Sequence, residues 1–298
     1  MPNIHVIDLH FQNLNHAIAS FIVETADGPV LVETGPHSTF EHLRNGVESL
    51  GMKMNDIKHV LLSHIHLDHA GAAWAMAELG ASIYLHPFGA KNMEDPSRLM
   101  ESAKRIYQDK MDVLWGQMKP ITNHLLIQVG HKEELIIGDQ KFKSWHTPGH
   151  AKHHIAWQVG STIFTGDVAG VKIDDGIVVP PCPPPDINIE DWKNSIELLL
   201  SLQPKELYLT HFDRITDIKG HLSALSAIID NWAEWIKNHW EAGESHEVMT
   251  PKFMDHVAGQ LRAAGLDDEE IQRYEAANPS WMSVAGLVRY WKKKQEQK

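Results

Sequence analysis

Cysteine is almost absent from this chain of 298 residues, in which Cys182 stands alone. A single thiol excludes an intrachain disulfide, so a hydrophobic core must stabilise the fold. Long apolar runs are missing too, since no stretch approaches the roughly 20 residues that span a bilayer. The beginning of the chain also lacks a basic start followed by an apolar signal segment. We therefore expect a cytoplasmic protein that has no membrane partner.

Positive charge is scarce as well, because 27 Lys and Arg residues face 39 Asp and Glu residues, a formal net charge of −12. The only concentrated basic run is 292–294, near the end of the chain. Nucleic acids bind basic surfaces, so we expect a small-molecule substrate and no nucleic-acid partner. Histidine, in contrast, is abundant with 21 residues. Because histidine is the commonest metal ligand and a frequent acid or base at neutral pH, the histidines are the place to look for function.

Hydrophobic periodicity divides the chain into two regions. In residues 1–215, short strand-like segments alternate with helical ones, which is typical of an α/β layered fold. One helix is predicted from Thr39 to Leu50, with Ser38 and Glu41 forming a capping box at its start. The strands are predicted at 4–9, 17–25, 30–33, 60–62, 82–85, 125–129, 134–137, 141–145, 155–159, 162–164 and 206–209.

Two segments depart from this alternation. A polar helical stretch at about 97–118 is interpreted as an insertion over one edge of the sheet. Residues 216–298 are predicted to form an appended C-terminal helical region, since no strand pattern recurs after Thr210 and each of Thr250-Pro251 and Asn278-Pro279 is suited to a helix start. Its last helix carries an apolar stripe that either covers the rest of the chain or forms a homodimer contact. The stripe consists of Trp281, Val284, Leu287, Val288 and Trp291.

The residues that carry chemistry follow the predicted strand 60–62. His64 and His66 lie two apart, so their imidazoles can point to one side at the end of a strand. Asp68 and His69 fall in the turn that follows, where the backbone can direct them to a second point nearby. Four potential ligands within six residues predict a metal site.

This segment resembles the metallo-β-lactamase-fold hydrolase superfamily, whose HxHxDH signature appears here as His64, His66, Asp68 and His69. The family needs a later His, Asp and His, each at the end of a strand. The chain offers His150 in Thr-Pro-Gly-His, Asp167 in Thr-Gly-Asp and His211 in Leu-Thr-His, in that order. The resemblance covers residues 1–215 and implies an αββα sandwich as the catalytic domain, with 216–298 appended to it.

The resemblance also implies a mechanism that uses two divalent metal ions. One would be held by His64, His66 and His150 and the other by Asp68, His69 and His211, with Asp167 bridging them. A set of five His and two Asp without a thiolate suits zinc, iron or manganese, of which zinc is the expected metal. A hydroxide between two cations is nucleophilic at neutral pH and would attack a small ester, thioester or lactone, while Asp68 relays a proton.

Several branches of the superfamily remain open. Glyoxalase II carries the whole ligand set together with a basic C-terminal cluster. The only basic run of this chain is 292–294, at the chain end. Lactonases carry the ligand set with a tyrosine shortly after the bridging Asp, which this chain lacks. Common β-lactamases lack that Asp, so phosphoester or β-lactam hydrolysis is expected only as a side activity. Persulfide dioxygenases keep the motif but use one iron, at the positions of His64, His150 and Asp167. A non-catalytic metal-binding module is disfavoured because all seven positions are filled.

Other residues invite weaker hypotheses. His153 and His154 follow His150 closely and are possible hydrogen-bonding partners of the ligands or substrate contacts. Cys182 is interpreted as a packing residue, and four other histidines as structural or surface residues: His16, His37, His86 and His146. Three further segments either line an apolar pocket or pack in the core: the insertion around Arg105, Tyr107, Met111 and Trp115, the proline loop 180–185, and the Trp-rich tail.

Overall fold

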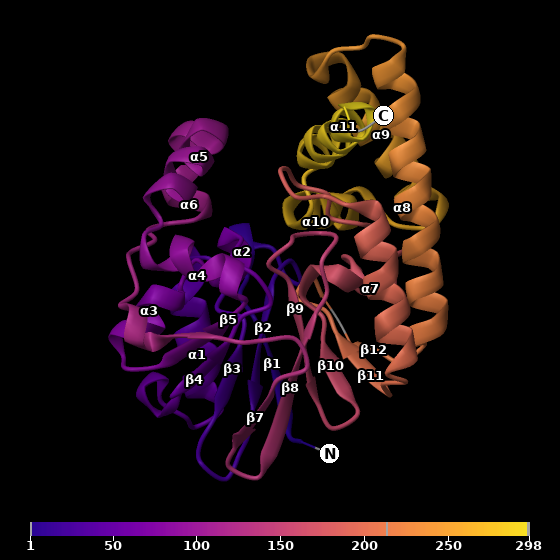
Figure 1. The fold of residues 1–298 in the computed structure, drawn as a ribbon. Coiled ribbons are helices and arrows are strands. Elements are labelled where there is room, and N and C mark those ends of the chain that lie inside the picture. The colour runs from indigo at the N-terminus through magenta and orange to yellow at the C-terminus, as the bar shows by residue number, and fades with distance from the viewer. Residues whose placement is uncertain (1, 213, 297–298) are drawn as a thin grey trace.

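Two six-stranded β-sheets face each other and carry helices on their outer faces (Figure 1). This arrangement is seen in a computed structural model that describes residues 2–212 and 214–296. The predicted mixed α/β layering is confirmed. Among the described residues, no helix combines the length and the apolar character needed to cross a bilayer.

Each sheet combines parallel and antiparallel pairs. In the first sheet β1, β2 and β3 pair antiparallel, and β3 to β6 continue in parallel. In the second sheet only β10 and β11 are parallel. The first sheet has the order β1 (Ile4–Asp8), β2 (Ala19–Val23), β3 (Val30–Val32), β4 (His59–Leu61), β5 (Ser82–Leu85) and β6 (Leu126–Gln128). The second has the order β12 (Arg214–Ile215), β11 (Glu206–Tyr208), β10 (Thr162–Phe164), β9 (Ile155–Val159), β8 (Gln140–His146) and β7 (Glu134–Ile137).

The helices divide into those that cover the sheets and those that extend beyond them. Local capping fixes several starts: the Asn188 side chain accepts from the Asp191 N–H, and Asp217 accepts from the Gly220 N–H. The helices are α1 (Phe40–Ser49), α2 (Leu67–Ala70), α3 (Ala73–Glu78), α4 (Pro87–Glu94), α5 (Ser97–Tyr107), α6 (Met111–Leu114), α7 (Ile189–Ser201), α8 (Ile218–Glu241), α9 (His246–Ala263), α10 (Asp268–Ala277) and α11 (Ser280–Glu296).

The core follows the two-residue period of the strands. In β2, Phe21 faces the second sheet and packs in one core with Phe142 and Trp157, whereas Ile22 faces the opposite side and packs in a core with Leu43 of α1. All five side chains are at most 1% exposed. The first sheet is therefore buried on both faces. Because the second sheet packs against one of them, the strand ends of the two sheets lie next to each other.

Most predicted strands agree with the structure to within two residues at each end, while three local predictions are wrong. The Ser38 hydroxyl donates to the Leu114 carbonyl and does not cap α1. A short strand, β12, follows Thr210 because it pairs with β11, a contact that no local pattern reveals. Helix α9 begins at His246, so Pro251 lies inside this helix and does not mark its start.

The insertion and the C-terminal helices rise as two arms on the same side of the sheets (Figure 1). The insertion comprises α5 and α6 and joins α4 to the loop before β6. In the C-terminal arm, Val284, Leu287 and Val288 of the apolar stripe are at most 1% exposed, and α11 packs on α8 and α9. Trp281 contacts Tyr107 of α5, with ring centroids 5.8 Å apart. The middle of the stripe is thus buried within the chain, and its two tryptophans, Trp281 and Trp291, are partly buried.

Candidate metal centre

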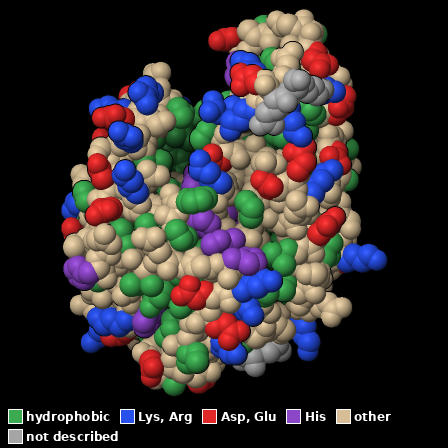
Figure 2. All heavy atoms as spheres, viewed as in Figure 1, with side chains coloured by type: hydrophobic (Ala, Val, Ile, Leu, Met, Phe, Trp, Pro, Cys, Tyr) green, Lys and Arg blue, Asp and Glu red, His purple; other side chains and the backbone are tan. Residues whose placement is uncertain are grey.

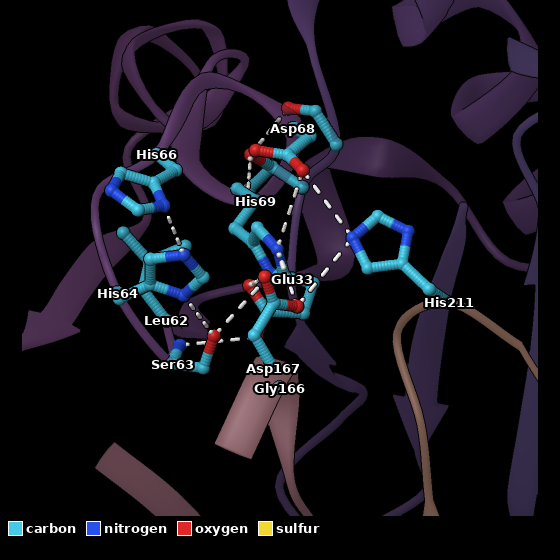
Figure 3. A network of polar contacts seen from close by, with 12 residues as sticks. Glu33, Leu62, Ser63, His64, His66, Asp68, His69, Gly166, Asp167 and His211 are labelled. Atoms are coloured by element: carbon cyan, nitrogen blue, oxygen red, sulfur yellow. Dashed lines mark hydrogen bonds and ion pairs between the residues drawn. The ribbon is translucent and has the colours of Figure 1, made fainter. Parts of the chain in front are cut away.

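The predicted ligands converge at one end of the two sheets, in the loops that follow the strands (Figure 3). Parallel strands deliver their carboxyl ends to the same edge, so loops that are far apart in sequence meet there. The loop after β4 and helix α2 supply His64, His66, Asp68 and His69, and those after β8, β10 and β11 supply His150, Asp167 and His211. Because β4 ends at Leu61, His64 and His66 lie in a loop beyond the strand end.

Three imidazoles form the first cluster. The His64 Nε2 atom lies 2.8 Å from His66 Nδ1 and 3.2 Å from His150 Nε2, and the last two atoms are 3.1 Å apart. These nitrogens can hold one cation between them. The structure therefore brings together the three residues predicted to hold the first metal.

The second cluster contains Asp68, His69 and His211. Asp68 Oδ2 lies 3.3 Å from His211 Nε2 and 3.6 Å from His69 Nε2. Asp167 stands between the clusters, with Oδ2 3.2 Å from His150 Nε2 and Oδ1 3.1 Å from His69 Nε2. This position suits a carboxylate that is shared by two cations.

Backbone carbonyls orient two of the ligand rings. His150 Nδ1 lies 2.8 Å from the Pro181 carbonyl and His211 Nδ1 lies 2.8 Å from the Ala17 carbonyl. Because a carbonyl only accepts, each Nδ1 must carry the proton, and in the neutral ring Nε2 then presents a lone pair to the cluster. The contacts outside the site thus select the tautomer that metal ligation requires.

Glu33 belongs to the site although it was not among the predicted residues. It follows β3, is 1% exposed, accepts from the Ser63 N–H, and lies with Oε2 3.4 Å from His69 Nδ1. A carboxylate behind an imidazole raises the basicity of the ring and fixes its direction. One signal in the sequence could have revealed it: Glu33 directly follows the wholly apolar segment 30–32. Burying a carboxylate there without a partner would cost free energy, so a partner is expected.

Of the two neighbouring histidines, His154 supports the site and His153 faces the pocket. His154 Nε2 accepts from the Asp167 N–H, and its Nδ1 pairs with the Thr147 hydroxyl at 2.8 Å. His153 lines the cavity, and its Nδ1 atom is buried without a hydrogen-bond partner among the described residues. The two residues therefore occupy different places in the site.

Burial keeps the imidazoles of the first cluster neutral. Desolvation, with His69 and other nearby imidazoles, lowers the pKa of His64 well below its usual value. Desolvation and His150 lower the pKa of His66 to about 3. The pKa of His150 is also lowered by burial, although Asp167 opposes the shift. Neutral rings are the form that binds metal, so these ligands are available throughout the physiological pH range.

Opposite charges dominate the second cluster. Burial raises the pKa of Asp68, but His69 and His211 outweigh it and lower the pKa to about 2. The pKa of Asp167 is held well below its usual value by His69, His150 and His211 against the effect of burial. The two carboxylates in turn raise the pKa of His69 despite its desolvation. The two carboxylates therefore stay ionised and can face a cation.

Unpartnered buried atoms show that the site fits a metal. Among the described residues, Asp167 Oδ1, His69 Nε2, His211 Nε2 and Glu33 Oε2 are buried without a hydrogen-bond partner. Buried polar atoms are normally satisfied, and buried carboxylates are normally paired or bound to metal. Asp167, His69 and His211 are also members of the groups that can hold an ion.

A cavity of about 370 Å³ opens above the clusters. Figure 2 shows histidine side chains across the middle of this face, below a hollow between the two arms. His66, Asp68, His150 and Asp167 lie in the floor of the cavity. Its walls are mostly apolar and include Phe11, Ile65, Leu99, Ala103, Ile106, Tyr107, Trp115, Pro181, Pro183, Pro184, Pro185 and Met282. Of the insertion residues named from the sequence, Tyr107 and Trp115 line the pocket, and Met111 packs in the core.

The proline loop beside the cavity contains Cys182 and is contacted by basic side chains from α11. Cys182 is 1% exposed, and burial raises the pKa of its thiol, as expected for an inert packing residue. Two basic residues of α11 reach the proline loop, where the Lys293 ammonium and the Arg289 guanidinium both donate to the Pro185 carbonyl. Basic groups thus lie beside the cavity even though they lie far from it in sequence.

We expect the Glu33→Gln variant to bind metal about 10- to 100-fold more weakly than the wild-type protein. A neutral amide no longer raises the basicity of the His69 ring, so the ring becomes a weaker ligand. Chelator competition followed by metal analysis measures the change. Glu24→Gln is a matched control, since Glu24 pairs with His5 and Asn3 in a contact with no ligand residue. Equal metal retention by the Glu33→Gln and wild-type proteins would show that Glu33 has no such role.

Comparison with known proteins identifies the family. The family model described as the metallo-beta-lactamase superfamily matches residues 15–211 of the chain. The chain belongs to the metallo-beta-lactamase superfamily. The matched residues include the candidate His and Asp metal sites described above.

Two curated proteins are similar in sequence to this chain. A metallo-beta-lactamase fold-containing protein of Sulfurisphaera tokodaii is 30% identical over 162 residues, which are 53% of this chain and 61% of the relative. A probable metallo-hydrolase of Bacillus subtilis is 21% identical over 214 residues, or 65% of this chain and 67% of the relative. The chain thus spans about 61% of the length of the archaeal relative.

A solved structure extends the likeness of fold to the C-terminal helices. A metallo-beta-lactamase family protein of Thermus thermophilus has a TM-score of 0.67 at 18% identity, covering 99% of this chain and 93% of the other. The crystal structure of the archaeal relative gives a TM-score of 0.62 at 24% identity over 75% of this chain and 86% of the other. The metallo-β-lactamase fold predicted from the sequence, with its appended helical region, is therefore confirmed.

Proposed function

We propose that this superfamily member hydrolyses a small ester, thioester or lactone with the help of two divalent metal ions, zinc being the expected metal. The observation that carries the proposal is the convergence of two adjacent ligand clusters, joined by Asp167, at the floor of a largely apolar cavity. His64, His66 and His150 would hold one ion, and Asp68, His69 and His211 the other. When bound, such a pair supplies a nucleophilic water at neutral pH and polarises a substrate oxygen.

Asp68 is the residue proposed to carry the proton. It lines the cavity, and its side chain is 20% exposed, so substrate can reach it. His69 and His211 hold it as a carboxylate at neutral pH, and its place in the cavity lining would let it take up a proton from the attacking water. His211 and His69 fix the carboxylate from the protein side.

The cavity favours an apolar acyl group over a phosphorylated one. An apolar lining with few polar groups binds hydrocarbon by removing it from water. Among the three proposed classes, a thioester is favoured by Arg289 and Lys293, which lie beside the wall of the cavity at Pro185 and can attract a negatively charged thiol.

Metal analysis and a substrate panel test the proposal. Protein purified without chelator is expected to contain about two metal ions per chain, mainly zinc or manganese, and to hydrolyse esters, thioesters or lactones. Removing the metal should abolish that activity and adding zinc should restore it. A single iron per chain with oxygen uptake would support the alternative, a mononuclear persulfide dioxygenase, and would overturn the hydrolase proposal.

The apolar walls should select the acyl group by size. Ser102 lines the cavity from α5, so a Ser102→Trp variant is expected to lower kcat/KM for long acyl chains about tenfold and to spare acetyl substrates. Glu101→Trp is the matched control, because Glu101 is exposed on the same helix outside the cavity lining. The measurement is kcat/KM of both variants for a series of substrates with increasing acyl length. An equal fall in kcat/KM for every length in Ser102→Trp would contradict a role of the cavity wall in selecting acyl size.

A further inference from the structure

His211 sits where two loops meet. One is the loop before β2, whose Ala17 carbonyl accepts from His211 Nδ1 at 2.8 Å. The other follows β10, and its Lys172 N–H donates to the His211 carbonyl at 2.9 Å. The ligand ring and the ligand backbone are therefore held by different segments, which must keep a fixed relation if the ring is to point at the metal.

Asp174 joins these two loops. Its Oδ1 atom lies 2.5 Å from His16 Nδ1, next to Ala17, and its own carbonyl accepts from the Lys172 ammonium at 2.8 Å. The His16 ring stacks on Phe212, the residue after His211, at a centroid distance of 4.6 Å. A half-exposed carboxylate outside the metal clusters thus reaches both supports of His211.

Helix α10 of the C-terminal region holds the loop that carries Asp174. The Arg273 guanidinium donates to Asp174 Oδ2 at 2.5 Å. The Tyr274 hydroxyl accepts from the Ile173 N–H at 3.0 Å and donates to the Ile177 carbonyl at 2.7 Å. Two neighbouring residues of one helix therefore fix the loop at both ends.

The backbone here needs such support. His10, Gln12, Asn13 and His16 all have positive φ, as does Asp174 with φ 50°. Non-glycine residues in this region cost free energy and persist only where their surroundings hold them. The contacts of Asp174 and α10 therefore hold the segments that support His211 in place.

We propose that Asp174 is a positioning residue through which α10 fixes the Ala17 carbonyl against His211, so that the C-terminal helices set the metal affinity of the Asp68–His69–His211 cluster. The inference rests on the proposed pair of metal ions. Contacts that orient ligating imidazoles typically change metal affinity 10- to 100-fold. The cluster of His64, His66 and His150 has no contact with Asp174 in the structure and should keep its affinity.

The test is metal retention by the full-length Asp174→Asn variant during dialysis against graded chelator. We expect one metal ion to be lost at a chelator concentration about 10- to 100-fold lower than in the wild-type protein, while the other is retained. Asp174→Glu should restore part of the affinity, because it keeps a carboxylate. Asp175→Asn is the matched control, since this neighbouring side chain is exposed and makes no polar contact among the described residues.

If Asp174→Asn fails to fold, as judged by circular dichroism, Arg273→Gln removes the contact from α10 and leaves Asp174 in place. It should also weaken one metal ion selectively. Retention of both ions with wild-type affinity in the folded variants, or equal weakening of both, overturns the inference while the proposed function stands. A wild-type protein that binds fewer than two metal ions contradicts the proposed function itself, and the inference fails with it.

Discussion

Replacing Asp167 with Ala is expected to lower kcat by about a thousandfold or more, beyond the 10- to 100-fold typical of residues that only orient a ligand. The carboxylate is 2% exposed and lies between the two clusters, within 3.5 Å of His69, His150 and His211. Its loss would remove the shared ligand and leave the imidazoles without a counter-charge. The fold should remain, because the side chain lies in the floor of the cavity.

The measurement is steady-state hydrolysis by the Asp167→Ala variant, together with its metal content and its circular dichroism spectrum. Asp68→Asn should be similarly inactive if two ions act, whereas a single iron held by His64, His150 and Asp167 would tolerate that change. Asp186→Asn is the control, since Asp186 lines the cavity and its carboxylate lies near His153, which is not a predicted ligand. Near wild-type turnover in either of the first two variants would disprove the two-metal mechanism.

Gly149→Ala is expected to lower the free energy of unfolding by about 3–5 kcal/mol, which is among the larger effects of single substitutions. Gly149 has φ +136°, and an added Cβ would lie 2.3 Å from the Trp192 Cα atom and 2.5 Å from its nitrogen. These are backbone atoms of α7, so no side-chain rotation can relieve the overlap. Because His150 follows directly, relief by backbone movement would also displace a predicted metal ligand.

Urea unfolding of the metal-free protein measures this effect without a contribution from metal binding. Gly51→Ala is the matched control, because Gly51 also has a positive φ of +76° but has no atom within 4 Å of an added Cβ. It should cost only about 1 kcal/mol, the strain of the left-handed backbone. Equal losses for the two variants would show that the contact with Trp192 is not the cause.

Much of the fold was predictable because its signals are local. The strands 134–137, 155–159 and 162–164 were predicted with the bounds they have in the structure, since short apolar segments ended by turn residues leave little choice. The motif residues were predictable for a similar reason: His64, His66, Asp68 and His69 lie within one turn of chain. Their arrangement in two clusters agrees with the prediction, and their role as ligands remains part of the proposed function.

Two of the differences come from contacts between segments that are far apart in the sequence, those of Ser38 and Glu33. Ser38 was predicted to cap α1, yet it lies inside the 3₁₀ turn His37–Thr39, and its hydroxyl donates to the Leu114 carbonyl, which the insertion brings to it. Strand β12 exists because β11 offers an open edge for pairing. Glu33 was not predicted because nothing near it in sequence shows that His69 and Ser63 will surround its carboxylate.

The sequence by itself determined the α/β layering, the family resemblance and the candidate ligands, because periodicity and motif spacing are properties of neighbouring residues. Only the tertiary structure decided that the middle of the α11 stripe is buried within the chain, that Lys293 reaches the loop beside the cavity, and that Asp174 joins α10 to the loop before β2. These features depend on where loops and helices meet after folding. Contacts between residues that are far apart in the sequence leave no periodic pattern in the chain, so packing alone establishes them.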